Sequence, residues 1–271
     1  MNNIVFAFLL TLFAGLSTGI GSCLAFFHKK PNTKFLALSL GFSAGVMVYV
    51  SFVEIFPKAK DILVESMGLK IGSGIAVISL FGGMLFIALI DKFVPPYENP
   101  HEPKDVIVML SDEEMAHHHR KKALLKMGTL SAVAIGIHNF PEGLATFLSA
   151  VEDPKLGIPI AFAIAIHNIP EGIAVAVPIY FATESRKKAF KLSLLSGLSE
   201  PVGAVVGYLI LMPFMTPLLF GILFSGVAGI MIFISMDQLL PTAEKYGEHH
   251  LSIYGFVSGM VIMALSLLLF L

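Results

Sequence analysis

The amino-acid sequence predicts an all-α, polytopic membrane protein. Of its 271 residues, 56% are hydrophobic and only 14% are charged, whereas a soluble globular chain is closer to 45 to 50% apolar and about 25% charged. The apolar residues also gather in runs of roughly 20, the length that a helix needs to cross a hydrocarbon core of about 30 Å. Both observations exclude an ordinary soluble domain. They indicate one transmembrane domain over residues 1–271.

The sequence contains about eight such runs, and most connections between them are short, which favours one compact bundle. We predict transmembrane helices at residues 4–27, 35–56, 71–94, 127–150, 157–181, 189–212, 217–240 and 252–271. The first run lacks the basic segment and the cleavage site of a signal peptide, so we expect it to be retained as a helix. The single cysteine, Cys23, excludes an intramolecular disulfide and any zinc site built from several cysteines.

Basic residues predict how the chain lies in the membrane. With an even number of spans, 14 of the 18 Lys and Arg residues fall in or beside connections on the side opposite both termini. Cytoplasmic loops carry an excess of Lys and Arg. We therefore expect a multi-pass protein of the cell (plasma) membrane with both termini outside.

One connection is much longer than the others. Residues 95–126 are mixed in charge, rich in Pro and His, and lie on the predicted cytosolic side. This composition predicts a flexible loop, with a short helix near 111–124. Its histidines, His101 and His117 to His119, either capture or sense metal on that side or belong to a solvated linker.

Two nearly identical stretches, HNFPEG at 138–143 and HNIPEG at 167–172, lie inside the fourth and fifth predicted helices. Each places its His four residues and its Asn three residues before a Glu, so the three side chains face broadly one way on a helix. The two helices are predicted antiparallel neighbours, and both motifs lie close to the bilayer midplane. The sequence therefore predicts two half-sites that meet at one depth, formed by His138, Asn139, Glu142, His167, Asn168 and Glu171.

Proline accompanies these polar residues. Pro141 and Pro170 have no N–H, so both helices are expected to kink beside the motifs. Broken backbone at membrane depth is tolerated where it faces protein or a hydrated cavity. In the sixth predicted helix, Glu200 is followed by Pro201 and again lies near mid-depth. Three glutamates are thereby expected at one level of the membrane.

No Lys or Arg lies deep in any predicted span to neutralise these carboxylates. A charged side chain at mid-membrane costs at least about 2.5 to 3.5 kcal/mol on insertion scales. The carboxylates are therefore either protonated or occupied by cations from outside the protein. Imidazole beside carboxylate suits Zn2+, Fe2+ and related ions, whereas Ca2+ and Mg2+ prefer oxygen alone. Glu142 and Glu171, one from each half, are placed to bridge two ions.

Three further residues lie near the predicted centre or its flanks. Glu54, near the outer end of the second helix, and Asp237, near the inner end of the seventh, mark an entrance and an exit or are solvated helix ends. Met47, near mid-depth, is either a thioether ligand or a packing residue, and packing is the better interpretation.

With these residues, the chain resembles the ZIP (Zrt/Irt-like) family of divalent-metal transporters and looks most like its bacterial ZupT-like branch. The likeness covers the whole chain: eight predicted helices, a long His-bearing loop after the third, and the two HNxPEG stretches. The resemblance implies uptake of Zn2+, Fe2+ and also Mn2+, Co2+ or Cd2+ into the cytosol through a binuclear site. It further implies a 3+2+3 inverted-repeat bundle of helices and a homodimer.

The resemblance also implies which residues form each subsite. The zinc-favouring subsite of the family corresponds here to His138, Glu142, His167 and Glu171. The neighbouring subsite corresponds to Asn139, Glu142, Asn168, Glu171 and Glu200. Asn168 stands where other family members carry an acid, so a centre that holds mostly one ion is an alternative to double occupancy.

The expected function is therefore metal transport, with no enzymatic activity, no cofactor and no nucleic-acid partner; the partners are divalent ions and the lipid bilayer. The alternative is a membrane-embedded zinc-dependent hydrolase, which needs a metal with an open position for water and a base beside it. The chain has no HExxH and its ligands come as two mirrored halves, which favours transport. A passive cation channel is a third interpretation.

Overall fold

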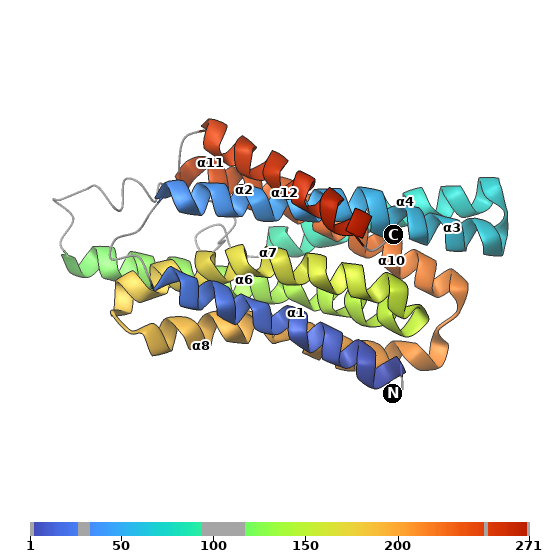
Figure 1. The fold of residues 1–271 in the computed structure, drawn as a ribbon, viewed down its shortest axis with the longest axis horizontal. Helices are drawn as coiled ribbons and strands as arrows, with labels where there is room; N and C mark the ends of the chain where they lie inside the picture. Colours follow the sequence, from blue (N-terminus) through green and yellow to red (C-terminus); the bar gives the residue numbers. More distant parts are fainter. Residues whose placement is uncertain (1–2, 27–32, 94–116, 247–248, 270–271) are drawn as a thin grey trace.

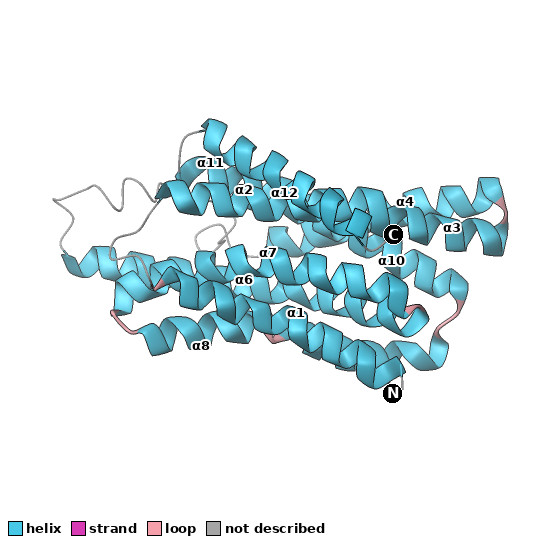
Figure 2. Cartoon of the chain, in the orientation of Figure 1, coloured by secondary structure: helices cyan, strands magenta, loops and turns pink. Residues whose placement is uncertain are grey.

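The computed structural model describes residues 3–26, 33–93, 117–246 and 249–269. Within these residues the chain is helical and contains no strand, as Figure 2 shows. Seven of the described helical segments are long and apolar enough to cross a membrane, by length and composition. The prediction of an all-α, polytopic membrane protein is therefore confirmed.

The seven segments correspond to seven of the eight predicted spans. The remaining span, predicted at 127–150, lies in α6 (His117–Glu152), which is not among the seven. Because α6 begins at His117, residues 117–126 of the predicted loop are helical. Residues 94–116 lie outside the described part of the chain, so the flexibility and the metal-binding role of this loop stay predictions.

The bounds of the other α-helices are α1 (Asn3–Ala25), α2 (Thr33–Val50), α3 (Phe56–Met67), α4 (Leu69–Phe93), α7 (Pro154–Thr183), α8 (Arg186–Gly197), α9 (Ser199–Val206), α10 (Pro217–Ile234), α11 (Leu240–Tyr246) and α12 (His249–Leu269). Short π-helical turns continue three of them: η1 (Ser51–Ile55) after α2, η2 (Gly207–Leu211) after α9, and η4 (Ser235–Leu239) after α10. A 3-10 turn, η3 (Met212–Phe214), follows η2.

The helices form two layers, which are separate in Figure 1. We call the lower one, built from α1, α6, α7, α8 and α9, the α7 layer; α7 packs most extensively on α1 and α6. The upper one, the α2 layer, contains α2, α3, α4, α10, α11 and α12, and its largest contacts join α2 to α12 and α4 to α10. The main contact between the layers is that of α2 with α7.

Glycine lets helices within each layer approach backbone to backbone. A Cβ atom on Gly172 of α7 would overlap the carbonyl oxygen of Thr18 on α1. In the other layer, a Cβ atom on Gly45 of α2 would overlap the carbonyl oxygen of Phe256 on α12. Small residues at helix contacts are the usual means of close packing in lipid, where the hydrophobic effect does not press helices together.

Two helices are longer than predicted. α2, η1 and α3 continue as one helical segment to Met67, so the end predicted at residue 56 is wrong. Pro57 lies in the first turn of α3, directly after the π-helical turn. Inside this continuous segment a proline leaves one carbonyl without its N–H donor, and the π-helical turn is the local adjustment that accommodates it. Pro241 follows η4 in the same way, and that helical segment continues through α11 to Tyr246, beyond the end predicted at residue 240.

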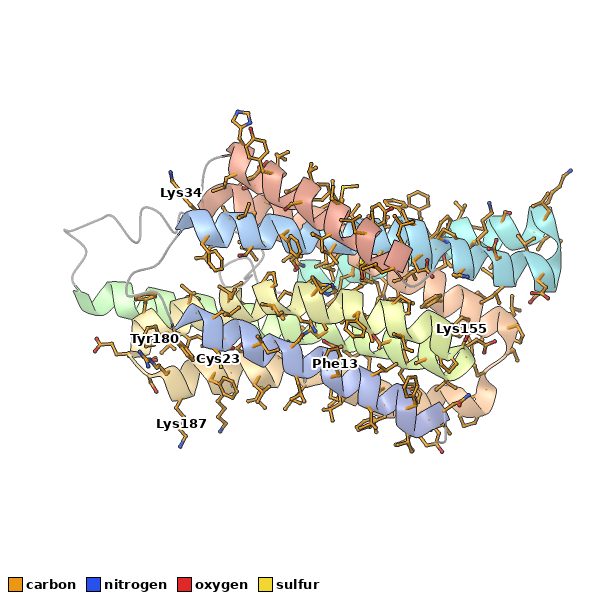
Figure 3. All side chains as sticks on the ribbon, viewed as in Figure 1. Phe13, Cys23, Lys34, Lys155, Tyr180 and Lys187 are labelled. Atoms are coloured by element: carbon orange, nitrogen blue, oxygen red, sulfur yellow. The ribbon has the colours of Figure 1, made fainter. Side chains whose placement is uncertain are left out.

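α1 begins and α12 ends toward the same end of the bundle (Figure 1). Figure 3 shows Lys34 and Lys187 at the opposite end and Lys155 near the first. This arrangement agrees with an even number of membrane crossings.

Candidate metal centre

The two polar motifs lie at one level of the α7 layer. α6 and α7 are neighbours connected through Asp153 alone, whose side chain caps α7 by accepting a hydrogen bond of 2.9 Å from the N–H of Lys155. The motifs, at 138–143 and 167–172, are almost equally far along the chain from this turn. The tight turn therefore brings the two half-sites to the same depth, and both helices continue through their prolines.

A direct contact joins the two motifs. Nε2 of His167 on α7 lies 3.3 Å from Oε2 of Glu142 on α6, and both side chains are fully buried. Nδ1 of His167 has no hydrogen-bond partner among the described residues. A neutral imidazole has one donor and one acceptor nitrogen, so this ring retains a nitrogen that is not engaged in the contact with Glu142.

Asn168 connects three helices. Its Nδ2 donates to the carbonyl oxygen of Ala14 on α1 at 2.9 Å and to Oε1 of Glu200 on α9. These two bonds use both N–H groups of the amide. Oδ1 of Asn168 accepts no hydrogen bond from a described residue. The amide therefore orients Glu200 and keeps its own oxygen for another partner.

A break in the sixth predicted helix positions Glu200. α8 ends at Gly197 and α9 begins at Ser199, because Pro201 has no N–H to donate to the carbonyl of Gly197, four residues earlier. Glu200 lies in the first turn of α9 and is fully buried. The backbone of α6 approaches closely here, since a Cβ atom on Gly143 would overlap the carbonyl oxygen of Glu200.

The remaining predicted residues lie around these contacts. Nδ2 of Asn139 donates to the carbonyl oxygen of Ser196 at 3.3 Å, which ties α6 to the end of α8. Glu171, one turn after His167, is fully buried. His138 lies on α6 four residues before Glu142, but its side chain is outside the described part of the structure.

Six predicted residues are fully buried in one layer: Asn139, Glu142, His167, Asn168, Glu171 and Glu200. Among the described residues, no Lys or Arg is buried with them. The structure brings Glu142 to His167 and Asn168 to Glu200. Within the described side chains, no three His, Cys, Asp or Glu residues meet as a ready-made metal cluster. The geometry thus consists of two polar pairs in a buried, acidic interior.

The flanking acids differ from the central ones in exposure. Glu54, in η1, is half-buried and lines a cleft of about 470 Å³ together with Lys58, Asp153 and Lys155. Asp237, in η4, is exposed. Met47 is fully buried within the apolar core. A larger cavity, of about 920 Å³, lies between α4, α6 and α10 and has almost only apolar walls, so its lining offers little to a metal ion.

Sequence reasoning missed the polar groups that hold the motifs in place. They are the carbonyl oxygens of Ala14 and Ser196 and the hydroxyl of Ser43, which donates to the carbonyl oxygen of His167 at 3.3 Å. A carbonyl oxygen leaves no trace in sequence. Ser43 is one serine in an apolar run, a weak signal.

Residues 76–267 match the sequence model of the family described as "ZIP Zinc transporter". The chain belongs to the ZIP family. The "Zinc transporter ZupT" of Clostridium perfringens is 60% identical over 278 residues, which cover 100% of this chain and 98% of the relative. Those of Lysinibacillus sphaericus (61% identical over 270 residues, 98% of each chain) and Chlorobium chlorochromatii (60% identical over 269 residues, 99% of each chain) are similarly close.

The resemblance to the ZIP family that the sequence predicted is confirmed. ZIP membership makes the chain a transporter rather than an enzyme, so the hydrolase interpretation is rejected.

Proposed function

We propose that this chain carries divalent transition-metal ions, Zn2+ foremost, across the cell membrane into the cytosol through the centre of the α7 layer. The three related proteins described above are named zinc transporters. The observation that carries the proposal is the full burial of three carboxylates, Glu142, Glu171 and Glu200, in the layer that also buries His167 and both motif asparagines. Gathering several carboxylates in a buried interior is costly. Binding of a transported cation beside them lowers this cost.

We assign seven residues to two adjoining subsites. The first consists of His138, Glu142, His167 and Glu171, and the second consists of Asn139, Glu142, Asn168, Glu171 and Glu200. Glu142 and Glu171 belong to both and bridge them. Imidazole with carboxylate suits Zn2+ and Fe2+, and Mn2+, Co2+ and Cd2+ are further substrates of this ligand set.

Three buried atoms support this assignment. Oδ1 of Asn139, Oδ1 of Asn168 and Nδ1 of His167 have no hydrogen-bond partner among the described residues. Buried polar atoms normally have a partner, and a bound ion or water commonly supplies it where the protein does not. Each atom is a possible metal ligand that loses no hydrogen bond on binding. Because Asn168 is neutral and already holds Glu200, we expect the first subsite to fill before the second.

We further propose eight spans in a 3+2+3 inverted repeat, with both termini outside and the chain forming a homodimer. Support for the repeat comes from two helices that share a local distortion. In each, a buried serine, Ser51 or Ser235, begins a π-helical turn, and a proline, Pro57 or Pro241, follows six residues later. A pair of matching irregularities in the two halves is typical of inverted-repeat transporters. Cross-linking in native membranes tests the dimer.

Zn2+ uptake into liposomes that contain the purified chain tests the function. We expect saturable uptake by the natural chain and a loss on the order of 100-fold in Glu142→Gln and in Glu171→Gln, since changes outside the ligand set alone cost about 10- to 100-fold in metal affinity or activity. Glu65→Gln is the matched control, because it removes an exposed carboxylate of α3.

The site assignment would be contradicted if Zn2+ uptake were equal in Glu142→Gln, Glu171→Gln and Glu65→Gln. Uptake that rises linearly with Zn2+ and does not saturate would favour a passive channel over a carrier.

A further inference from the structure

Buried hydroxyl groups of this bundle bond in two ways. Thr11, Thr146 and Ser235 each donate to the carbonyl oxygen four residues earlier in their own helix, the usual arrangement for a hydroxyl inside a helix. Others reach a carbonyl oxygen of a neighbouring helix. Ser193 does so within the α7 layer, and Ser225 does so within the α2 layer.

Ser43 differs from both groups because its bond crosses between the layers. It lies on α2, is fully buried, and donates to the carbonyl oxygen of His167 on α7 at 3.3 Å. The two residues are 124 positions apart in the chain. The acceptor is the backbone of a proposed metal ligand, at the place where α2 and α7 make the main contact between the layers.

His167 lacks the support that ligand histidines usually have. A metal-bound imidazole commonly donates its second ring N–H to a carboxylate, carbonyl or water, which fixes the ring orientation. Nε2 of His167 faces Glu142, itself a proposed ligand, and Nδ1 has no hydrogen-bond partner among the described residues. No described residue outside the ligand set therefore restrains the ring by a hydrogen bond, so its position depends on the position of the backbone.

The backbone at His167 is also weakened locally. Pro170, three residues later, has no N–H, so the carbonyl of Ile166 loses its helical donor. A restraint from a second helix matters most where a helix has lost one of its own hydrogen bonds.

We propose that Ser43 is a positioning residue for the metal ligand His167: its hydroxyl, donated from the α2 layer, holds the His167 backbone so that the imidazole stays directed at Glu142. The inference rests on the proposed function, in which His167 binds the transported ion. Removing the hydroxyl loosens one ligand and leaves the others in place. The expected effect is weaker Zn2+ binding with a retained maximal rate of transport.

Three variants of the full chain test this role, each measured for equilibrium Zn2+ binding in detergent and for KM and maximal rate in liposomes. Ser43→Ala removes the hydroxyl without adding bulk. Ser43→Thr keeps it. Ser225→Ala is the matched control, because it removes another fully buried serine hydroxyl that bonds across helices, here to the carbonyl oxygen of Ala76 inside the α2 layer.

We expect Ser43→Ala to raise KM and the dissociation constant for Zn2+ about threefold, the effect of one typical hydrogen bond between membrane helices, with a maximal rate within about twofold of the natural chain. Ser43→Thr should lie closer to the natural chain than Ser43→Ala does, and Ser225→Ala should match the natural chain. Unchanged Zn2+ binding in Ser43→Ala, or an equal loss in Ser225→Ala, would overturn the proposal.

A failure of the proposed transport function can be distinguished from a failure of the positioning role of Ser43. If the natural chain binds Zn2+ but does not carry it into liposomes, the proposed function is wrong. The binding measurements on Ser43→Ala and Ser225→Ala still decide the positioning role.

Discussion

In the α7 layer the fully buried polar side chains include three glutamates, two asparagines and a histidine, whereas those described in the α2 layer are all serines. The acidic residues Glu54 and Asp237 of the α2 layer are more exposed than Glu142 and Glu171: Glu54 is half-buried and Asp237 is exposed. The α2 layer also presents large apolar side chains outward, such as Ile78 of α4, which is 74% exposed. Outward apolar side chains of this kind suit contact with lipid.

This difference indicates a division of roles between the layers. The proposed ligands all lie on α6, α7 and α9, so a rigid-body movement of the α7 layer would keep them together. Inverted-repeat transporters commonly work by rigid-body movement of one helix bundle against another. The α2 layer packs on α7 and donates one hydrogen bond to the site, from Ser43 to the backbone of His167.

Overpacking next to the site gives the largest contrast between the layers. Gly143→Ala places a Cβ atom against the backbone of Glu200, whereas Gly82→Ala, on α4 of the other layer, meets nothing within 4 Å. We expect Gly143→Ala to lose about 1 to 3 kcal/mol of stability and about tenfold in Zn2+ uptake as Glu200 is displaced. Thermal unfolding in detergent and liposome uptake measure both effects.

Gly82→Ala serves as the control and should be neutral or more stable by up to about 1 kcal/mol, the usual gain of alanine over glycine in a helix. Equal behaviour of the two variants would mean that the α6 and α9 contact does not support the site.

The next prediction removes the negative charge of Glu200 from the proposed second subsite and compares the effect with that of Glu142→Gln. Glu200→Gln leaves Glu142 and Glu171 unchanged and keeps an oxygen able to accept from Asn168. We expect a change of about three- to tenfold in the preference for Zn2+ over Fe2+ or Cd2+, with Zn2+ uptake reduced much less than in Glu142→Gln, because the proposed assignment gives Glu200 to one subsite only. Competition uptake with pairs of ions measures this preference. A loss as complete as that of Glu142→Gln would show that the two subsites act as one.

The smallest effect is expected in the α2 layer. Glu54 lines a cleft that also contains Lys58, Asp153 and Lys155. Glu54→Gln should lower the rate of Zn2+ uptake at low ion concentration about twofold, with less effect in high salt, because an accessible charge mainly changes the rate of association. Uptake at low and high ionic strength tests this. A loss comparable to that of Glu171→Gln would place a ligand in the α2 layer and end the proposed division.

Local patterns in the sequence were enough to predict most of the helices and the arrangement of residues within each motif. Apolar runs of membrane length predicted the helices, and the spacing of His138 to Glu142 and of His167 to Glu171 predicted one face for each motif. Pro201 is visible in the sequence directly after Glu200, and the structure shows that the helix breaks beside them. The ends of helices were less predictable: the helix expected to stop at 56 continues to Met67, since a π-helical turn accommodates Pro57.

The sequence by itself determined the all-α membrane class, the ZIP family and the identity of the buried acids, because each depends on composition or on residues within a few positions of one another. Only the tertiary structure decided the partners. His167 meets Glu142 from 25 positions away, Asn168 meets Glu200 from 32, and Ser43 meets His167 from 124. Such contacts depend on how closely glycine faces let helices pack and on where each helix bends, and no local pattern in the chain specifies either quantity.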